Sequence, residues 1–144
     1  MKLSTRTRYG IRAAIELAEN YGSGPINLKL IAHSQDISVK YLEQLMTIMK
    51  GAGIVRSVRG AKGGYILKKP PEEITFAELF NALEGPLVLT ECLDDAEYCK
   101  KFADCAAKDV WTRMSKIISE FFDSITLQDM VKKSRKGNTP SYQI

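Results

Sequence analysis

The chain has 144 residues and 44% hydrophobic content, enough for one globular domain with at most an extension. It has no apolar run near the ~20 residues of a membrane span and no apolar signal-peptide core, so we expect a cytoplasmic protein with no membrane partner. The net charge of +4 is uneven, because residues 1–69 hold 12 Lys/Arg and 4 Asp/Glu whereas residues 70–144 hold 9 and 13. A basic first half favours nucleic-acid binding. With one histidine and no nucleophile–base pair, we predict neither an enzyme nor a small-molecule substrate.

The first predicted element is a helix that Ser4 can cap and that runs to about Asn20. Arg6, Arg8 and Arg12 lie near its start. Cations at this end do not stabilise a helix, because the helix dipole is positive there. Phosphate contact is one reason for such residues, and Arg8 is a candidate DNA contact.

Two shorter predicted helices follow, separated by a polar turn at residues 35–37. Asn27 can cap the first and Ser38 the second, and Gly51 and Gly53 end the second. One face of the second helix carries an apolar stripe of Leu42, Leu45, Met46 and Met49. The opposite face can contact phosphates and base edges, or it is an ordinary solvated face. The candidate DNA contacts are Ser38, Lys40, Tyr41, Glu43, Gln44 and Thr47.

Two β-rich runs, residues 54–58 and 64–67, flank a glycine-rich tip and predict a hairpin wing. Glycine lets a backbone approach a polyanion, and arginine suits the negative potential of a narrow minor groove. The candidate DNA contacts at this tip are Arg59, Lys62 and Gly63, and the alternative is a solvated hairpin tip. Helix, turn, helix and hairpin in this order predict a winged helix-turn-helix whose partner is double-stranded operator DNA.

Beyond the wing, residues 75–83 predict a short helix with a capping box at Thr75 and Glu78. Residues 87–105 show no sustained period and predict a loop. A long amphipathic helix begins at Ala106, with an apolar stripe too wide for one winged helix to cover. We expect it to form a homodimer, the alternative being burial against its own domain. The candidate interface residues are Val110, Trp111, Met114, Ile117, Ile118, Phe121 and Phe122.

The predicted fold class is therefore mainly α with a small β-hairpin wing and a long C-terminal dimerisation helix. Four segments make up the chain. They are a winged helix-turn-helix DNA-binding domain over 1–85, a cysteine-bearing loop over 86–105, dimerisation helices over 106–131 and a disordered polar tail over 132–144.

The three cysteines, Cys92, Cys99 and Cys105, lie within the predicted loop with the spacing C-x6-C-x5-C. Structural cysteines are usually buried on helices or strands, so three in an acidic, aperiodic segment look like ligands. Thiolates favour zinc or an iron–sulfur cluster. The paired CxxC spacing of zinc ribbons is absent, which favours a cluster, while zinc, thiol redox chemistry or no ligand remain alternatives.

The chain resembles the IscR-type transcription regulators, a family that includes IscR, NsrR and CymR. The resemblance lies in LSTRTRYGIRA, in ISVKYLEQLMTIMKGAGIVRSVRGAKGGYIL, in the three cysteines and in FFDSITLQDMV, in that order. It covers the chain up to about Lys133. It implies a dimeric winged-helix transcription factor in which Cys92, Cys99 and Cys105 hold an iron–sulfur cluster, [2Fe–2S] in preference to [4Fe–4S].

The fourth ligand is where the sequence departs from the family. The histidine found three residues after the last cysteine is Lys108 here, whose protonated amine is a poor ligand. Some relatives use an acid at position 8, and Arg8 cannot ligate. The remaining candidates are His33, which is otherwise a solvent-facing helix residue, Asp104, Asp109, Glu91, a small exogenous thiol or water.

These observations predict a homodimeric DNA-binding regulator that senses iron–sulfur cluster status and controls cluster-biogenesis genes. A nitric-oxide or redox-sensing repressor of the same family is one alternative. A cluster carrier or electron-transfer protein is another, against which the basic half and the glycine-rich wing argue.

Overall fold

The computed structural model describes residues 2–137, with side chains through residue 134. In chain order the elements are α1 (Thr5–Glu19), α2 (Leu28–Gln35), α3 (Val39–Gly51), β1 (Val55–Val58), β2 (Gly64–Leu67), η1 (Pro71–Glu73), α4 (Phe76–Leu83), α5 (Glu91–Asp94), η2 (Phe102–Asp104), α6 (Ala106–Ser124) and α7 (Leu127–Gly137). The predicted fold class, mainly helical with one hairpin, is confirmed.

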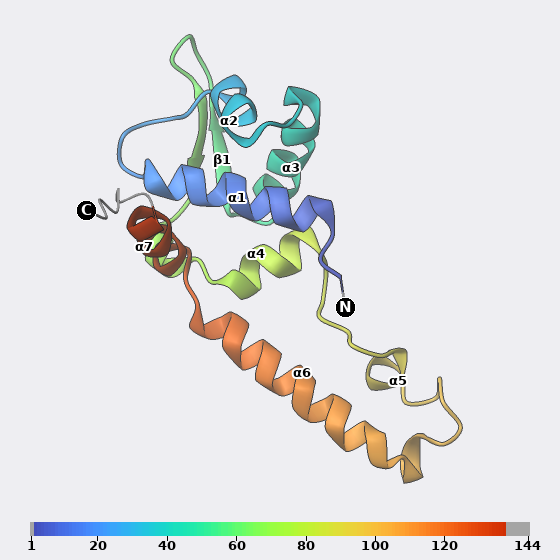
Figure 1. Cartoon of the computed structure of the whole chain (residues 1–144). Coiled ribbons are helices and arrows are strands. Elements are labelled where there is room, and N and C mark those ends of the chain that lie inside the picture. Colours follow the sequence, from blue (N-terminus) through green and yellow to red (C-terminus); the bar gives the residue numbers. More distant parts are fainter. Residues whose placement is uncertain (1, 138–144) are drawn as a thin grey trace, which may run out of the picture.

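Helices α1, α2 and α3 pack around one core that α4, α7 and the base of the hairpin close (Figure 1). The predicted stripe of α3 is wholly inside this core. The largest fully buried side chains are Ile31, Leu42, Leu45, Met46, Met49, Ile54, Val55, Ile74, Leu79, Leu83, Leu127 and Val131.

The helix boundaries follow local sequence signals. Each predicted capping side chain accepts a backbone N–H bond in the first turn of its helix, at Ser4, Asn27, Ser38 and Thr75. Asp36 ends α2 in the left-handed conformation (φ 54°), and its N–H donates to the carbonyl oxygens of Ala32 and His33. This residue turns the chain from α2 into α3, which sets the two helices at an angle to each other.

The hairpin depends on two adjacent glycines. Strands β1 and β2 are antiparallel, with Val55 opposite Leu67 and Val58 opposite Gly64. A Cβ on Gly63 would collide with the carbonyl oxygen of Val58, and one on Gly64 would collide with that of Ile26. The close approach at Gly64 allows Tyr65 and Ile26 to exchange two backbone hydrogen bonds of 2.9 and 3.0 Å. The loop before α2 therefore fastens the second strand of the wing.

The start of α1 is tied to the end of α4. Glu84 accepts hydrogen bonds from the hydroxyls of Ser4 (2.6 Å) and Thr7. These two bonds hold the pKa of the Glu84 carboxyl below its usual value. The point at which the chain leaves the winged-helix body is thus fixed against its first helix.

Helix α7 returns to the winged-helix body, which corrects two expected boundaries. Leu127 and Val131 are in the core, and the Leu127 N–H donates to Ile74 O at 2.8 Å. The segment that we assigned to dimerisation over 106–131 therefore ends inside the first domain. The disordered tail expected over 132–144 is also wrong in part, because α7 continues to Gly137; residues 138–144 lie outside the described part. An apolar face that docks on a core stabilises a helix whose remaining surface is polar.

Replacing Leu127 by alanine should lower the free energy of unfolding by about 2–5 kcal/mol, because it removes a fully buried side chain and leaves a cavity. Leu30→Ala is the matched control, since this side chain is 64% exposed and its truncation should cost little. Urea unfolding of both variants at one protein concentration measures the difference. Equal stability of the two would show that α7 does not contribute to the core.

Helix α6 projects away from the body as an arm (Figure 1). Only its last turns contact the body, where the Phe122 ring lies 4.7 Å from that of Phe76 and 4.9 Å from that of Phe80. No residue of α6 is fully buried. Phe122, which we expected in the interface, thus contacts α4 of its own chain, and its place in a dimer interface stays a prediction.

No helix within residues 2–137 combines the length and the apolarity needed to span a membrane.

Candidate nucleic-acid interface and cysteine segment

The outer face of α3 presents most of its predicted DNA contacts to solvent. Ser38, Lys40, Glu43, Gln44 and Thr47 are exposed. Because the opposite face is locked into the core, these side chains have a fixed direction, as a helix that reads a groove requires. Val39, in the first turn of the same face, is 40% exposed and can contact a thymine methyl group.

Three polar groups around α3 are partly committed to the protein itself. Ser38 Oγ accepts the N–H of Tyr41 (3.0 Å), and Thr47 Oγ1 donates to the carbonyl of Glu43 (2.8 Å). Lys50 Nζ donates to Ser57 Oγ (3.2 Å), which links the end of the helix to β1. Glu43 and Gln44 make no such side-chain bond within the described residues and are available to base edges.

Tyr41 is less available than its place in the sequence suggested. It is half-buried, and its ring packs edge-to-face on Tyr9 with centroids 6.2 Å apart. Arg12 lies over the other aromatic of this pair, 5.2 Å from the centroid of the Tyr9 ring. Tyr41 therefore offers at most its hydroxyl to a ligand while its ring fixes α3 against α1.

The arginines of α1 separate into two kinds. Arg6 Nε donates to the carbonyl of Leu83 at 2.7 Å, so Arg6 completes the end of α4. Arg12 contacts Tyr9, as described above. Arg8 is exposed and has no hydrogen bond or ion pair within the described residues. Arg6 and Arg12 thus have contacts within the chain, and Arg8, which has no such interaction among the described residues, is the most available of the three to phosphate.

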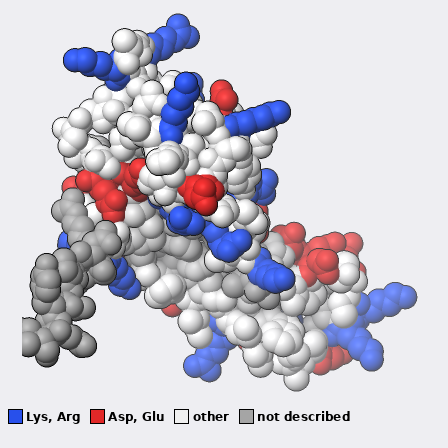
Figure 2. Space-filling view, turned by 45° about the horizontal axis from the view of Figure 1, so that its top comes forward, with Lys and Arg blue, Asp and Glu red and all other residues white. Residues whose placement is uncertain are grey.

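The wing tip is exposed at Arg59 and Lys62, and Lys and Arg side chains project from the hairpin end in Figure 2. Gly63 shapes this tip, since its N–H donates to Gly60 O at 3.0 Å and a side chain would strike the strand before it. The structure therefore gives Gly63 a conformational role and leaves the two cations as the charged contacts.

The three cysteines lie in the segment that leads from α4 to α6. Cys92 is in α5, Cys99 follows it, and Cys105 is the residue that precedes α6. All three are half-buried and unpaired. Thr90 Oγ1 lies 3.1 Å from Cys92 Sγ and makes no capping bond to α5.

Two of the thiols share a neighbour. A hydrogen bond to Glu91 raises the pKa of the Tyr98 phenol, with smaller Coulombic effects from Glu91 itself, Cys99 and Cys92. No three Cys, His, Asp or Glu side chains in the described part of the chain converge as a metal site. The three cysteine sulfurs are suitable ligands for a metal or cluster that prefers thiolates. Binding such a group requires the segment to change conformation so that the three sulfurs come together.

The candidates for a fourth ligand differ in position. Lys108 Nζ lies 4.7 Å from the centroid of the Phe102 ring and donates to Ala103 O (3.5 Å). The amine is therefore engaged by a cation–π contact and a hydrogen bond. His33 is exposed on α2, at the opposite end of the protomer from α5 (Figure 1). Asp104, Asp109 and Glu91 are exposed within or beside the cysteine segment. Position therefore favours an acid over His33 within one chain.

The apolar stripe of α6 is exposed over most of its length. Ile118 is half-buried beside Phe122, whereas the outer stripe consists of Val110, Trp111, Met114, Ile117 and Phe121, each at least 36% exposed. A run of five large apolar side chains along one arm is an interaction surface rather than the surface of a monomer. We call these five residues the outer stripe.

Comparisons with known proteins agree with this architecture. A family model described as Rrf2, iron-dependent transcriptional regulator, matches residues 3–133. The regulator CymR of Bacillus subtilis is 42% identical over 130 residues, which are 90% of this chain and 89% of that protein.

Solved structures extend the likeness to three dimensions. The structure of CymR, the global cysteine regulator of B. subtilis, has a TM-score of 0.80 and 40% identity, covering 92% of this chain and 98% of that one. The structure of T. potens IscR has a TM-score of 0.79 and 39% identity, covering 98% of this chain and 93% of that one.

Proposed function

Because the chain belongs to the Rrf2 family of transcriptional regulators, we propose that it is a cytoplasmic, homodimeric DNA-binding regulator that senses an iron–sulfur cluster. Its relatives are regulators and not enzymes. The observation that carries the sensing proposal is the set of three unpaired, half-buried cysteines between the DNA-binding body and α6. Control of cluster-biogenesis genes is the expected outcome of such sensing.

Cys92, Cys99 and Cys105 would hold the cluster, with a fourth position filled by an acid of the segment or by an exogenous ligand. Bound there, a cluster supplies a centre that is lost on oxidation or iron scarcity. A weak non-cysteine ligand makes that loss easier. We favour [2Fe–2S] over [4Fe–4S], in line with the family resemblance.

The route from the cysteines to DNA follows from chain connectivity. Cys105 immediately precedes α6, whereas Cys92 lies in α5, the helix that follows α4 in the chain. Drawing these sulfurs together fixes the angle between the body and the arm that carries the outer stripe. Since that arm joins two subunits, its angle sets the spacing of the two α3 helices, which must match half-sites about one DNA turn apart.

A thiol-redox or nitric-oxide-responsive repressor is the second candidate, because the same three cysteines serve it. The two candidates differ in what anaerobically purified protein contains. Iron with acid-labile sulfide supports cluster sensing, whereas metal-free protein whose DNA affinity follows thiol oxidation supports the second.

Three substitutions test the assignment of the DNA-reading face. Arg59→Ala should weaken binding most at A·T-rich flanks, because arginine favours a narrow minor groove. Gln44→Ala should cost about 1–3 kcal/mol only at operators that place adenine opposite it. Glu43→Ala should relax specificity while affinity is kept or rises, because a carboxylate near phosphates excludes sequences that give it no donor.

Binding titrations on operators selected from a random duplex library measure these effects. Ser119→Ala, an exposed change on α6, is the control and should leave the selected sequences unchanged. Equal losses for all three variants on every duplex would mean that α3 only clamps phosphates.

A further inference from the structure

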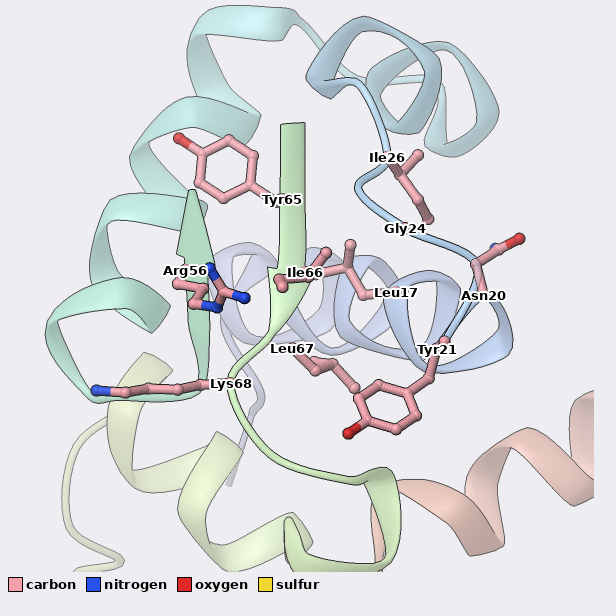
Figure 3. A pocket seen from close by; sticks show the side chains of 11 residues that line it. Leu17, Asn20, Tyr21, Gly24, Ile26, Arg56, Tyr65, Ile66, Leu67 and Lys68 are labelled. Atoms are coloured by element: carbon pink, nitrogen blue, oxygen red, sulfur yellow. The ribbon is translucent and has the colours of Figure 1, made fainter. Parts of the chain in front are cut away.

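A pocket of about 330 Å³ lies between the end of α1 and the second strand of the wing (Figure 3). Its walls come from three places in the chain: the α1–α2 loop around residues 20–26, residues 65–68 of the hairpin, and Arg56 of β1. This volume lies within the range of small-molecule sites. The pocket is on the body of each protomer and is separate from the cysteine segment.

The floor of the pocket is apolar. Leu17 and Leu67 are core residues, and Ile26, Ile66 and the ring of Tyr21 border them (Figure 3). The wall formed by the α1–α2 loop carries two glycines, which have no side chains to fill the pocket. Gly22 and Gly24 have φ values of 88° and 90°, and a Cβ on either would meet nothing within 4 Å. The local conformation therefore favours residues that leave the cavity unfilled.

The rim of the pocket is cationic. Arg56 and Lys68 line it, and no Asp or Glu does. The ion pairs found among the side chains of residues 2–134 involve other residues, so neither cation has a carboxylate partner there. In Figure 3 the guanidinium of Arg56 lies next to Ile66, its cross-strand partner, while the Lys68 side chain extends away from it.

We propose that this pocket binds a small organic anion, a carboxylate or phosphate attached to a compact apolar body, and that its occupancy biases the wing. A guanidinium without a carboxylate partner at the rim of an apolar pocket matches both parts of such a molecule, since arginine forms bidentate bonds to carboxylate and phosphate. Asn20 at the rim provides a further polar side chain.

The pocket is mechanically connected to DNA recognition. Tyr65 and Ile26 line it and are the two residues whose paired backbone bonds fasten the wing to the loop. A ligand that contacts both sides stabilises this junction and limits the directions the wing can take. If the ligand raises the affinity for DNA by some factor, linkage requires that DNA raise the affinity for the ligand by the same factor.

A backbone phosphate of DNA is the competing source of an anion at Arg56. The apolar floor argues against it, because a phosphodiester has no apolar group to bury there. The pocket is also at the base of the hairpin and not at the exposed tip that carries Arg59.

Benzoate and benzamide, which share a shape and differ in charge, test the proposal on the full chain without DNA. We expect benzoate to shift the amide resonances of residues 20–26, 56 and 65–68 and to bind about tenfold more tightly than benzamide, as a charge-assisted bond provides. Arg56→Met should remove this preference, and Arg113→Met, which removes an exposed arginine of α6, should retain it. If Arg56→Met does not fold, Arg56→Gln takes its place.

Equal affinities for benzoate and benzamide, resonance shifts outside these residues, or loss of the preference in Arg113→Met would each overturn the proposal. A second arm measures DNA affinity with and without benzoate. The proposal expects benzoate to change the affinity of the wild-type protein and not that of Arg56→Met. If Arg56→Met instead loses DNA affinity without any benzoate and the wild type does not bind benzoate, the arginine is a DNA-phosphate contact and the proposal is wrong.

Discussion

Cys99→Ala is expected to remove all iron and acid-labile sulfide from anaerobically purified protein. The segment offers three thiols and no histidine nearby, so losing one leaves two sulfur donors, too few to retain a cluster against chelation. The same result is expected for Cys92→Ala and Cys105→Ala. Visible absorption together with iron and sulfide analysis measures it.

The cysteine variants should keep their fold, which separates loss of ligand from loss of structure. None of the three cysteines belongs to the hydrophobic core, so truncation to alanine leaves the packed body intact. The melting temperature of each variant should therefore match that of the wild-type apoprotein. Stoichiometric zinc without sulfide in the wild-type preparation would reject the iron–sulfur assignment and favour a zinc site.

Phe121→Asp is expected to convert the proposed dimer to a monomer. This side chain is 57% exposed in the protomer, although it is among the largest apolar groups of the chain. A charge in an apolar interface has no partner and is strongly unfavourable. In a two-fold dimer the change occurs twice. At about 2 kcal/mol for each copy of such an anchor, the dissociation constant rises about a thousandfold. Sedimentation equilibrium over a range of protein concentrations measures this shift.

Two controls place the effect on the outer stripe. Ser119→Asp adds the same charge to an exposed position of α6 that is not part of the stripe, and it should leave the dimer unchanged. Ile117→Asp, on the stripe and 55% exposed, should act like Phe121→Asp. An unchanged dimer in both stripe variants would show that subunits pair through another surface.

The DNA-binding architecture was predictable because its signals are local. Spacing of Leu42, Leu45, Met46 and Met49 fixes which face of α3 is buried, and the capping residues fix where helices start. The glycines of the wing tip identify a turn that only they can adopt. The family resemblance, carried by strings of the same region, is confirmed by the comparisons.

The sequence by itself determined the order of elements, the exposed face of α3 and the clustering of three cysteines in one segment. Only the tertiary structure decided which side chains are already engaged within the chain. The sequence does not distinguish Phe122 from its neighbours on the apolar stripe. The structure does, because Phe122 contacts Phe76, 46 positions earlier in the chain. The position of Arg6 in the sequence suggested a phosphate contact, whereas in the structure its guanidinium donates to the end of α4. Periodicity specifies that a face is apolar or charged, but the element that covers it is set by long-range packing, which leaves no local pattern.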